Sequence, residues 1–257
     1  MTQLIINADD FGYSRAVSYG ILTAYKSGVL TSTTMMANMP GFAHAQWLVQ
    51  GEPGLAIGVH LTLTAGKPLV RAASSLTDGT DFRKRQAVFA HPEVIDPDEL
   101  YEEWDAQIVK VAGAGIPITH LDSHHYVHGI PAFAPVITAL AEKYALPVRN
   151  NFTLVPENVR TTTALWKIFN FAQFKDMTRS YGAAFEDIMA MIQKDAAPFV
   201  DLATVEANCH PGYVDETLLY GSSFNLPRMR EVTMLCDPRF KAMLEQAGFT
   251  LTTYRSL

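Results

Sequence analysis

The sequence contains little cysteine, few basic residues and no long apolar run, and each absence excludes a class of protein. Its 257 residues include two cysteines, Cys209 and Cys236, which are too few for a disulfide framework and have no CxxC spacing. This favours a reducing compartment, so a cytoplasmic location is expected. With 20 Lys and Arg against 26 Asp and Glu, the formal net charge is -6. The sequence therefore lacks the basic surface that nucleic-acid binding requires.

No segment approaches the roughly 20 consecutive apolar residues that a membrane-spanning helix requires. The amino-terminal MTQLIINADDFG has neither a basic leader nor a small-residue cleavage site, so no secretion signal and no membrane partner are expected. Hydrophobic residues make up 48% of the sequence, which is enough for a substantial core. One domain is therefore expected over residues 1–257. The sequence leaves homodimer formation open.

Apolar periodicity predicts alternating strands and helices, and hence an α/β fold. Strands are expected at Gln3–Asn7, Ser32–Met36, Ala56–Leu63, Ile118–Asp122, Pro147–Arg149, Thr204–Cys209 and Thr250–Tyr254. Helices are expected at Ser14–Ser27, Phe42–Gln50, Pro97–Ala114, Phe133–Tyr144, Thr162–Phe174 and Ala183–Lys194. About seven strands favour a closed or nearly closed β/α barrel over an open sheet. Gly66–Pro92 and Gly212–Pro227 are expected to be long loops at the rim of a substrate cleft.

Two adjacent carboxylates, Asp9 and Asp10, follow the first expected strand. Successive side chains of a strand point to opposite faces, but the two carboxylates converge if the backbone is already turning into the loop. Burying such a pair is unfavourable because the charges repel and lose water, so a cation or hydrogen-bond donors must compensate them. The alternative is that the pair caps a turn into Phe11 and Gly12. The pair alone does not decide between these two interpretations.

Histidines are concentrated at two later strands. His60 lies within the apolar sequence IGVHLT, where a lone histidine is more often a core residue than a ligand. HLDSHHYVH, from His120 to His128, places four histidines in nine residues directly after a strand. His124 and His128 would align if the segment were helical, whereas an extended segment would present alternate residues. The density of histidine favours a metal site over an exposed histidine-rich turn.

A further histidine, His210, follows the expected strand Thr204–Cys209. Cys209 is expected to point into the core, because neighbouring strand residues face opposite ways, so that His210 rather than a thiol faces the site. The alternative is that His210 caps the turn at Pro211 and Gly212. Five of these residues lie where a strand meets its following loop, the face on which β/α barrels assemble active sites: Asp9, Asp10, His60, His124 and His210. One metal site with an acid and a base beside it explains them together.

The motifs NADDFG, TSTTMMAN, GVHLTLTAGKPL, THLDSHHYVH and CHPGY follow one another along the chain. In these motifs the sequence resembles the YdjC-like carbohydrate deacetylases, which include chitooligosaccharide deacetylases and belong to the polysaccharide deacetylase superfamily. The resemblance spans the chain from Ile5 to the final TLTTYRSL. It implies a distorted TIM-like barrel and a metal-dependent hydrolase. Such an enzyme cleaves the amide C–N bond of an N-acetylated sugar, for example a chitooligosaccharide such as diacetylchitobiose.

The resemblance also implies a ligand set. Asp10, His60 and His124 would hold a divalent metal ion. The family favours magnesium, whereas the mixed nitrogen and oxygen donors leave zinc and cobalt open. Tyr126 stands where many relatives have a third histidine, a departure that concerns the substrate lining more than the metal.

Three further residues take catalytic roles by the same resemblance. Asp9 would be the base that accepts a proton from water, and Arg149 would orient it. His210 would be the acid that protonates the departing amine, near its ordinary pKa of about 6.5.

Two other functions stay open on the sequence. Asp and His ligands at strand ends also serve phosphoesterases and amidohydrolases, but a phosphorylated sugar would need a basic clamp, and only Arg83–Arg85 offers one. A non-catalytic sugar-binding regulator would not require Asp9 and His210. The sequence assigns no role to His125 or His128, and it does not identify the sugar or say whether it carries a phosphate.

Overall fold

The computed structural model describes residues 1–70, 74–169 and 185–257. The strands of its main sheet are β1 (Thr2–Phe11), β2 (Ser32–Met35), β3 (Ala56–Leu61), β6 (Ile118–Ser123), β7 (Ala164–Lys167), β8 (Thr204–Cys209) and β9 (Phe249–Thr252). Their order is β6-β3-β2-β1-β8-β7, with β9 paired to β1, and each of these pairs is parallel. The carboxyl ends of the strands therefore all lie at the same end of the sheet, where the active sites of α/β proteins form.

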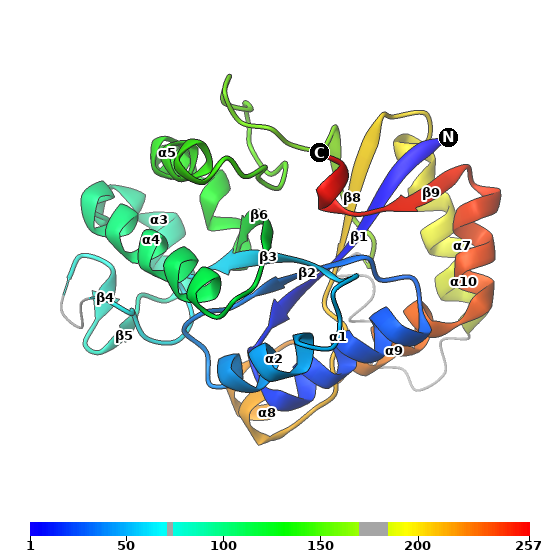
Figure 1. The fold of residues 1–257 in the computed structure, drawn as a ribbon, viewed down its shortest axis with the longest axis horizontal. Helices are drawn as coiled ribbons and strands as arrows, with labels where there is room; N and C mark the ends of the chain where they lie inside the picture. Colours follow the sequence, from blue (N-terminus) through cyan, green and yellow to red (C-terminus); the bar gives the residue numbers. More distant parts are fainter. Residues whose placement is uncertain (71–73, 170–184) are drawn as a thin grey trace.

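β1 lies in the middle of the sheet and has three neighbours. Along one edge it pairs with β8 from Gln3 to Ala8. It pairs with β9 from Thr2 to Ile5 and with β2 from Asn7 to Phe11. Because a strand has two edges, β9 and β2 share the second one, each beside one half of β1 (Figure 1). Apart from Gln3, every residue of β1 is buried, as expected for a strand covered on both faces.

The sheet curves into an incomplete barrel whose free edges are β6 and β7. Val148 forms a single parallel bridge with Leu121 of β6, and its N–H donates to the carbonyl of Arg160. The segment around Val148, which follows the helix α5 (Ala134–Tyr144), therefore lies beside β6. This half-barrel of parallel strands, surrounded by helices, confirms the predicted α/β fold, a distorted TIM-like barrel.

Helices cover the outside of the sheet (Figure 1). They are α1 (Arg15–Ser27), α2 (Phe42–Val49), α3 (Arg85–Ala90), α4 (Pro97–Gly113), α5 (Ala134–Tyr144), α7 (Phe185–Ala196), α8 (Glu216–Gly221), α9 (Pro227–Cys236) and α10 (Pro238–Gln246). α4 packs against β3 and α5, whereas α10 packs against β9 and α7 on the opposite side. The hydroxyl of Ser14 caps α1 by accepting the N–H of Val17, as predicted. Among the helices in the described ranges, none is long and apolar enough to cross a membrane.

One predicted helix was wrong. Within Thr162–Phe174, residues Ala164–Lys167 form β7, which pairs with β8, while residues 170–174 lie outside the described ranges. In β7 the side chain of Trp166 is buried and stacks on the rings of Phe199 and Phe249. These partners are distant in sequence, so local periodicity does not reveal them.

Pro147–Arg149 was predicted as a full strand, but it contributes only the bridge at Val148. Proline has no N–H to donate to a ladder, which limits pairing at this position. Over the described ranges, the sheet has seven strands, which matches the predicted number, with β7 in place of this segment. The predicted helix Ala183–Lys194 is present in its described part as α7, which continues to Ala196.

The two expected long loops contain secondary structure. Gly66–Pro92 includes the short hairpin of β4 (Thr77–Asp78) and β5 (Asp81–Phe82) and the helix α3. Gly212–Pro227 includes α8, and it leads into α9 and α10, which were not predicted. A 3-10 helix, η5 (Tyr254–Ser256), follows β9 where the strand was expected to continue.

Candidate active site

A break in β1 brings Asp9 and Asp10 to the same side. The register between β1 and β2 shifts between Ala8 and Phe11, and Asp10 has a left-handed backbone with φ 70°. A non-glycine residue in this region stores of order 1 kcal/mol of strain or more. The shift cancels the strand alternation, because a regular strand would turn one of the two carboxylates away from the site. Both are buried, with 3% and 1% of their surfaces exposed.

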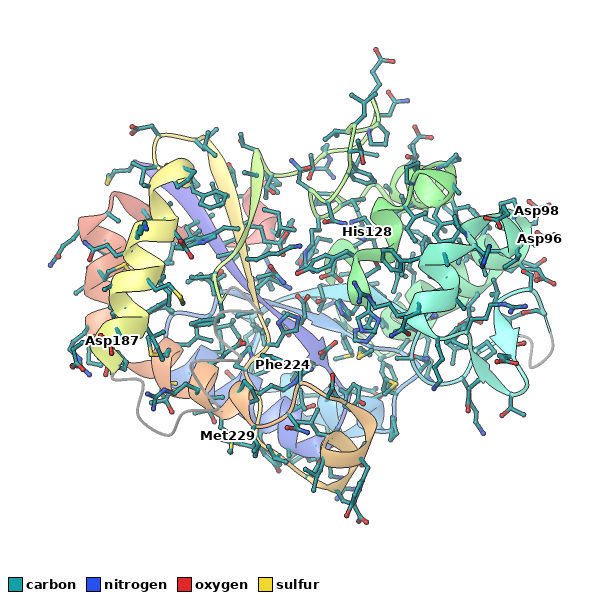
Figure 2. The ribbon with its side chains drawn as sticks, turned by 180° about the vertical axis from the view of Figure 1, so that it is seen from behind. Asp96, Asp98, His128, Asp187, Phe224 and Met229 are labelled. Atoms are coloured by element: carbon teal, nitrogen blue, oxygen red, sulfur yellow. The ribbon has the colours of Figure 1, made fainter. Side chains whose placement is uncertain are left out.

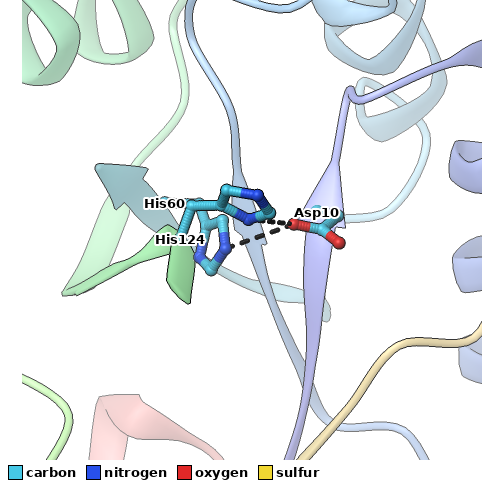
Figure 3. Close-up of side chains that lie close together, drawn as sticks. All are labelled: Asp10, His60 and His124. Carbon is cyan, nitrogen blue, oxygen red and sulfur yellow. Dashed lines mark hydrogen bonds and ion pairs between the residues drawn. The ribbon is translucent and has the colours of Figure 1, made fainter. Parts of the chain in front are cut away.

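Asp10, His60 and His124 converge at the carboxyl ends of β1, β3 and β6 (Figure 3). Asp10 Oδ1 lies 3.3 Å from His60 Nε2 and 3.0 Å from His124 Nδ1. One donor atom from each of the three residues lies within 4.8 Å of the others. Two of the side chains are buried and that of His124 is 13% exposed. The cluster is thus closed on the protein side and open toward His124.

His60 is oriented by a carboxylate that the sequence analysis did not single out. Asp122 Oδ1 lies 2.6 Å from His60 Nδ1, so Nε2 is the ring atom that faces Asp10. The hydroxyl of Thr34 donates to the other oxygen of Asp122 at 2.9 Å. A carboxylate behind a histidine fixes its tautomer and raises its basicity, as is usual around metal sites. The signal was available, because Asp122 ends a strand inside the histidine-rich motif.

Arg149 is completely buried and contacts three carboxylates. Its guanidinium donates to Asp9 Oδ1 at 2.6 Å and Oδ2 at 2.9 Å, a two-pronged contact. It also lies 2.8 Å from Asp122 and 2.6 Å from Glu206. Glu206 was not predicted as a site residue, although a charged residue inside the apolar strand TVEANC is a signal that could have identified it.

The electrostatics of the site keep Asp9 and Asp10 ionised. Burial alone would raise the pKa of Asp9, but the charge and hydrogen bonds of Arg149 outweigh it and hold the pKa below its ordinary value. Burial likewise opposes ionisation of Asp10, whose pKa Arg228 and His124 nevertheless hold well below the ordinary range. Arg228, from α9, donates to Asp10 Oδ2 at 2.6 Å and was missed because α9 itself was not predicted.

His210 lies beside Asp9. Its Nε2 is 3.6 Å from Asp9 Oδ2, and its backbone N–H donates to Glu231 of α9. Phe224 meets the imidazole edge to face and lies over the centre of the molecule in Figure 2. Burial lowers the pKa of His210 to about 4 even though Asp9 favours the charged form. The expectation of an ordinary pKa near 6.5 was therefore wrong, and His210 is neutral at pH 7.

His128 does not join His124. The segment His124–Gly129 is a 3-10 helix, η2, interrupted by left-handed backbone at His125 and Tyr126, so neither the helical nor the extended arrangement applies. The ring of His128 is buried between Ser123 Oγ, at 2.5 Å, and the carbonyl of Arg149, at 3.2 Å. Figure 2 places it inside the molecule. His128 thus supports the backbone on both sides of the site.

His125 and Cys209 take other positions. His125 Nδ1 lies 2.8 Å from the hydroxyl of Thr64, and its ring lies against that of His124, with centroids 3.9 Å apart. Cys209 is fully buried, and its thiol points to the carbonyl of Asn7. Burial raises the pKa of this thiol well above its ordinary value, so Cys209 is no nucleophile.

The donor set of Asp10, His60 and His124 fits a divalent cation. Two imidazoles and one carboxylate suit zinc, cobalt or nickel, and the open side leaves room for the waters that magnesium retains. Burial would lower the pKa of His60, but Asp122 and the neighbouring aspartates raise it to about 10. A positive charge is therefore strongly favoured at this place, and a metal ion would supply it in place of a proton.

The YdjC-like family model matches residues 3–246. The chain belongs to the YdjC-like family. A carbohydrate deacetylase from Brevibacillus brevis is 37% identical over 260 residues, covering 99% of each chain. A crystal structure from Enterococcus faecalis V583, named as a candidate cellobiose-phosphate cleavage protein, has a TM-score of 0.85 at 36% identity and covers 99% of this chain and 98% of its own. A polysaccharide deacetylase from Bacillus cereus shares the fold alone, with a TM-score of 0.51 at 11% identity and coverage of 99% and 92%.

Proposed function

We propose that this YdjC-like protein hydrolyses the acetamide group of an N-acetylated sugar with a bound divalent metal ion. Its assignment as a carbohydrate deacetylase rests on its family and on relatives of that name that match almost end to end. The observation that carries the metal-dependent mechanism is the convergence of Asp10, His60 and His124 beside Asp9 and His210.

In the proposed reaction, Asp10, His60 and His124 would hold the ion. When bound there, it would supply Lewis-acid polarisation of the acetamide carbonyl and would lower the pKa of water. Asp9, ionised and fixed by Arg149 through two hydrogen bonds, accepts the proton of the attacking water. Amide hydrolysis then releases acetate and a free amino sugar.

The departing amine needs a proton, and His210 is the group that we assign to deliver it. Because its pKa is lowered to about 4, the resting imidazole carries no proton to give. Asp9 Oδ2 lies 3.6 Å from His210 Nε2, so the proton taken from water by Asp9 is released next to the imidazole. The pair therefore passes one proton from water to the amine, which balances the reaction without an external acid.

We take a chitooligosaccharide such as diacetylchitobiose, free or phosphorylated, as the substrate, magnesium as the native ion, and chitin breakdown as the setting. Both cysteines are free thiols, Cys209 buried and Cys236 half-buried, which fits the cytoplasm.

The phosphoesterase alternative has less support in the site. The guanidiniums of Arg149 and Arg228 are bound to carboxylates, and Arg83 donates its Nε–H to the carbonyl of Ser75. Arg85 lies over the ring of Phe89. The two arginines that lie within the site are thus already paired with Asp9 and Asp10.

The deciding experiment is acetate release from diacetylchitobiose by metal-stripped protein, with magnesium, zinc or cobalt added back singly. Acetate that appears only with a metal supports the proposal and identifies the ion. Phosphate release is measured in parallel on the 6-phosphate of cellobiose. Phosphate without acetate would move the assignment to a phosphoesterase, and no product with any ion would leave a sugar-binding role.

A further inference from the structure

Tyr254, in η5, reaches the interior of the barrel from beyond the last strand. It is 1% exposed, and its ring stacks on that of His120, with centroids 3.6 Å apart and planes 6° from parallel. Arg255 anchors the segment by donating to the carbonyls of Gly54 and Leu55. The position of the Tyr254 ring is therefore fixed by contacts to two other parts of the fold.

The phenol of Tyr254 donates to Glu206 Oε2, and Glu206 in turn contacts Arg149. Glu206 Oε1 accepts Arg149 Nε at 2.8 Å and Nη2 at 2.6 Å. Glu206 is completely buried on β8 and does not reach the cluster of Asp10, His60 and His124. Both of its oxygens are used, one to hold the guanidinium and one to accept the phenol.

Two edges of the Arg149 guanidinium are thereby occupied by different carboxylates. Glu206 takes the edge of Nε and Nη2, and Asp9 takes the edge of Nη1 and Nη2. A planar fork held along two edges cannot rotate about its own bonds without breaking contacts on both sides. The oxygens of Asp9 are thus placed by Arg149, and the plane of Arg149 is held by Glu206 together with Asp122, which lies 2.8 Å from Nη2.

We infer that Glu206 and Tyr254 are positioning residues, which set the catalytic base Asp9 through Arg149. This inference rests on the proposed function, in which Asp9 accepts a proton. A misplacement of about 1 Å at a catalytic group far from the altered residue can lower turnover by about 100-fold. Loss of the phenol hydroxyl releases one oxygen of Glu206 and loosens the hold on Arg149. The contact of 2.8 Å between Arg149 and Asp122, the carboxylate behind His60, is not altered directly.

Tyr254→Phe and Glu206→Gln test this inference, with Tyr144→Phe as the matched control. The hydroxyl of Tyr144 also donates to a carboxylate, Asp105, at 2.7 Å, but on the outer surface between α4 and α5. We expect kcat to fall about 10-fold in Tyr254→Phe and about 100-fold in Glu206→Gln. KM and the dissociation constant for the metal ion should stay within about twofold, and Tyr144→Phe should match the wild type in all three.

A second readout does not depend on activity. The Nε–H of Arg149 is buried against Glu206, so its proton should exchange slowly with solvent. Its signal in a ¹⁵N-correlated NMR spectrum is assigned by its absence in Arg149→Lys. In Tyr254→Phe its exchange should accelerate about 10-fold, and in Tyr144→Phe it should not change. Unchanged exchange or unchanged kcat in Tyr254→Phe overturns the inference, as does an equal loss of kcat in the control. If the wild type releases no acetate, the proposed function fails, and the exchange measurement alone decides whether the contact through Glu206 exists.

Discussion

At the scale of single residues, the site separates the group that would take the proton from those that would hold the metal ion. Asp9 is bound to Arg149, whereas Asp10 faces two histidines. Asp9→Asn should therefore keep the metal affinity within about threefold but lower acetate release by at least about 100-fold, because the amide cannot accept a proton. His124→Ala should lose both. Metal content and acetate release measured on the same samples separate the two effects, and full metal binding by His124→Ala would contradict the ligand assignment.

A second prediction concerns Asp122, which would not bind the metal ion itself but contacts the proposed ligand His60. Its carboxylate fixes the ring that presents Nε2 to Asp10. Asp122→Asn should weaken metal binding by about 10- to 100-fold, as expected for a carboxylate behind a ligating histidine. Calorimetric titration of the metal-stripped protein measures this affinity. The exposed Glu93, which lies 3.0 Å from His91, gives the matched variant Glu93→Gln, whose affinity should equal that of the wild type.

At the scale of elements, the close approach of β3 to β6 depends on Gly58. A Cβ atom built there would lie 2.6 Å from two ring atoms of His120, which is itself stacked on Tyr254. Gly58→Ala should therefore lower the free energy of unfolding by about 1–3 kcal/mol through overpacking. Urea denaturation measures the loss. Gly51→Ala, which has open space around its added methyl, should change it by no more than about 0.5 kcal/mol.

Most elements could be predicted from the sequence because their apolar pattern is local. Asp9 and His60 lie near the ends of the buried strands β1 and β3, and His210 directly follows β8, so these strand exits could be identified. β7 has only four residues, and its identity comes from pairing with β8. Such a pairing leaves no periodic signal, and the stretch was interpreted as a helix.

The contacts between site residues were harder to predict from the sequence than the site residues themselves. The positions of polar residues after strands predict that their side chains lie close together. They do not predict that a residue of β8 contacts a residue of η5. Glu206 and Tyr254 are 48 residues apart, and Asp10 and Arg228 are 218 apart. The lowered pKa of His210 likewise follows from burial under neighbours that only the fold brings together.

At the scale of the whole molecule, the free energy of unfolding should have a maximum and should fall at both lower and higher pH. Four histidines are held neutral by burial, with pKa values lowered to about 3 in His125 and His128, to about 4 in His210 and well below the ordinary value in His120. Their unfolded forms bind protons below pH 6.5, so each contributes stability that is present above pH 6.5 and is lost on acidification. Glu231 opposes them, since its pKa is raised from 4.5 to about 8.

Above pH 6.5 the sign reverses. His60, with its pKa raised from 6.5 to about 10, and Glu231 keep protons in the fold that the unfolded chain has lost. Their contribution is present at lower pH and disappears as pH rises toward 8 and then 10. In a chelating buffer, the unfolding free energy should therefore peak near pH 6.5 and change by about 1.4 kcal/mol per pH unit for each uncompensated proton. Urea titrations from pH 5 to 9 measure the curve, and a steady rise to pH 9 would contradict it.

The central place of β1 has a consequence for the way the chain folds. The strand that carries Asp9 and Asp10 pairs with β8, and Cys209 of β8 follows Asn7 of β1 by 202 residues. Pairing across so long a separation must overcome a large loop-closure entropy, which slows folding and leaves the β8 edge of β1 exposed until late. The segments that finish the site are thus the same ones that protect its first strand from aggregation. Folding and the acquisition of activity should for that reason be a single late event.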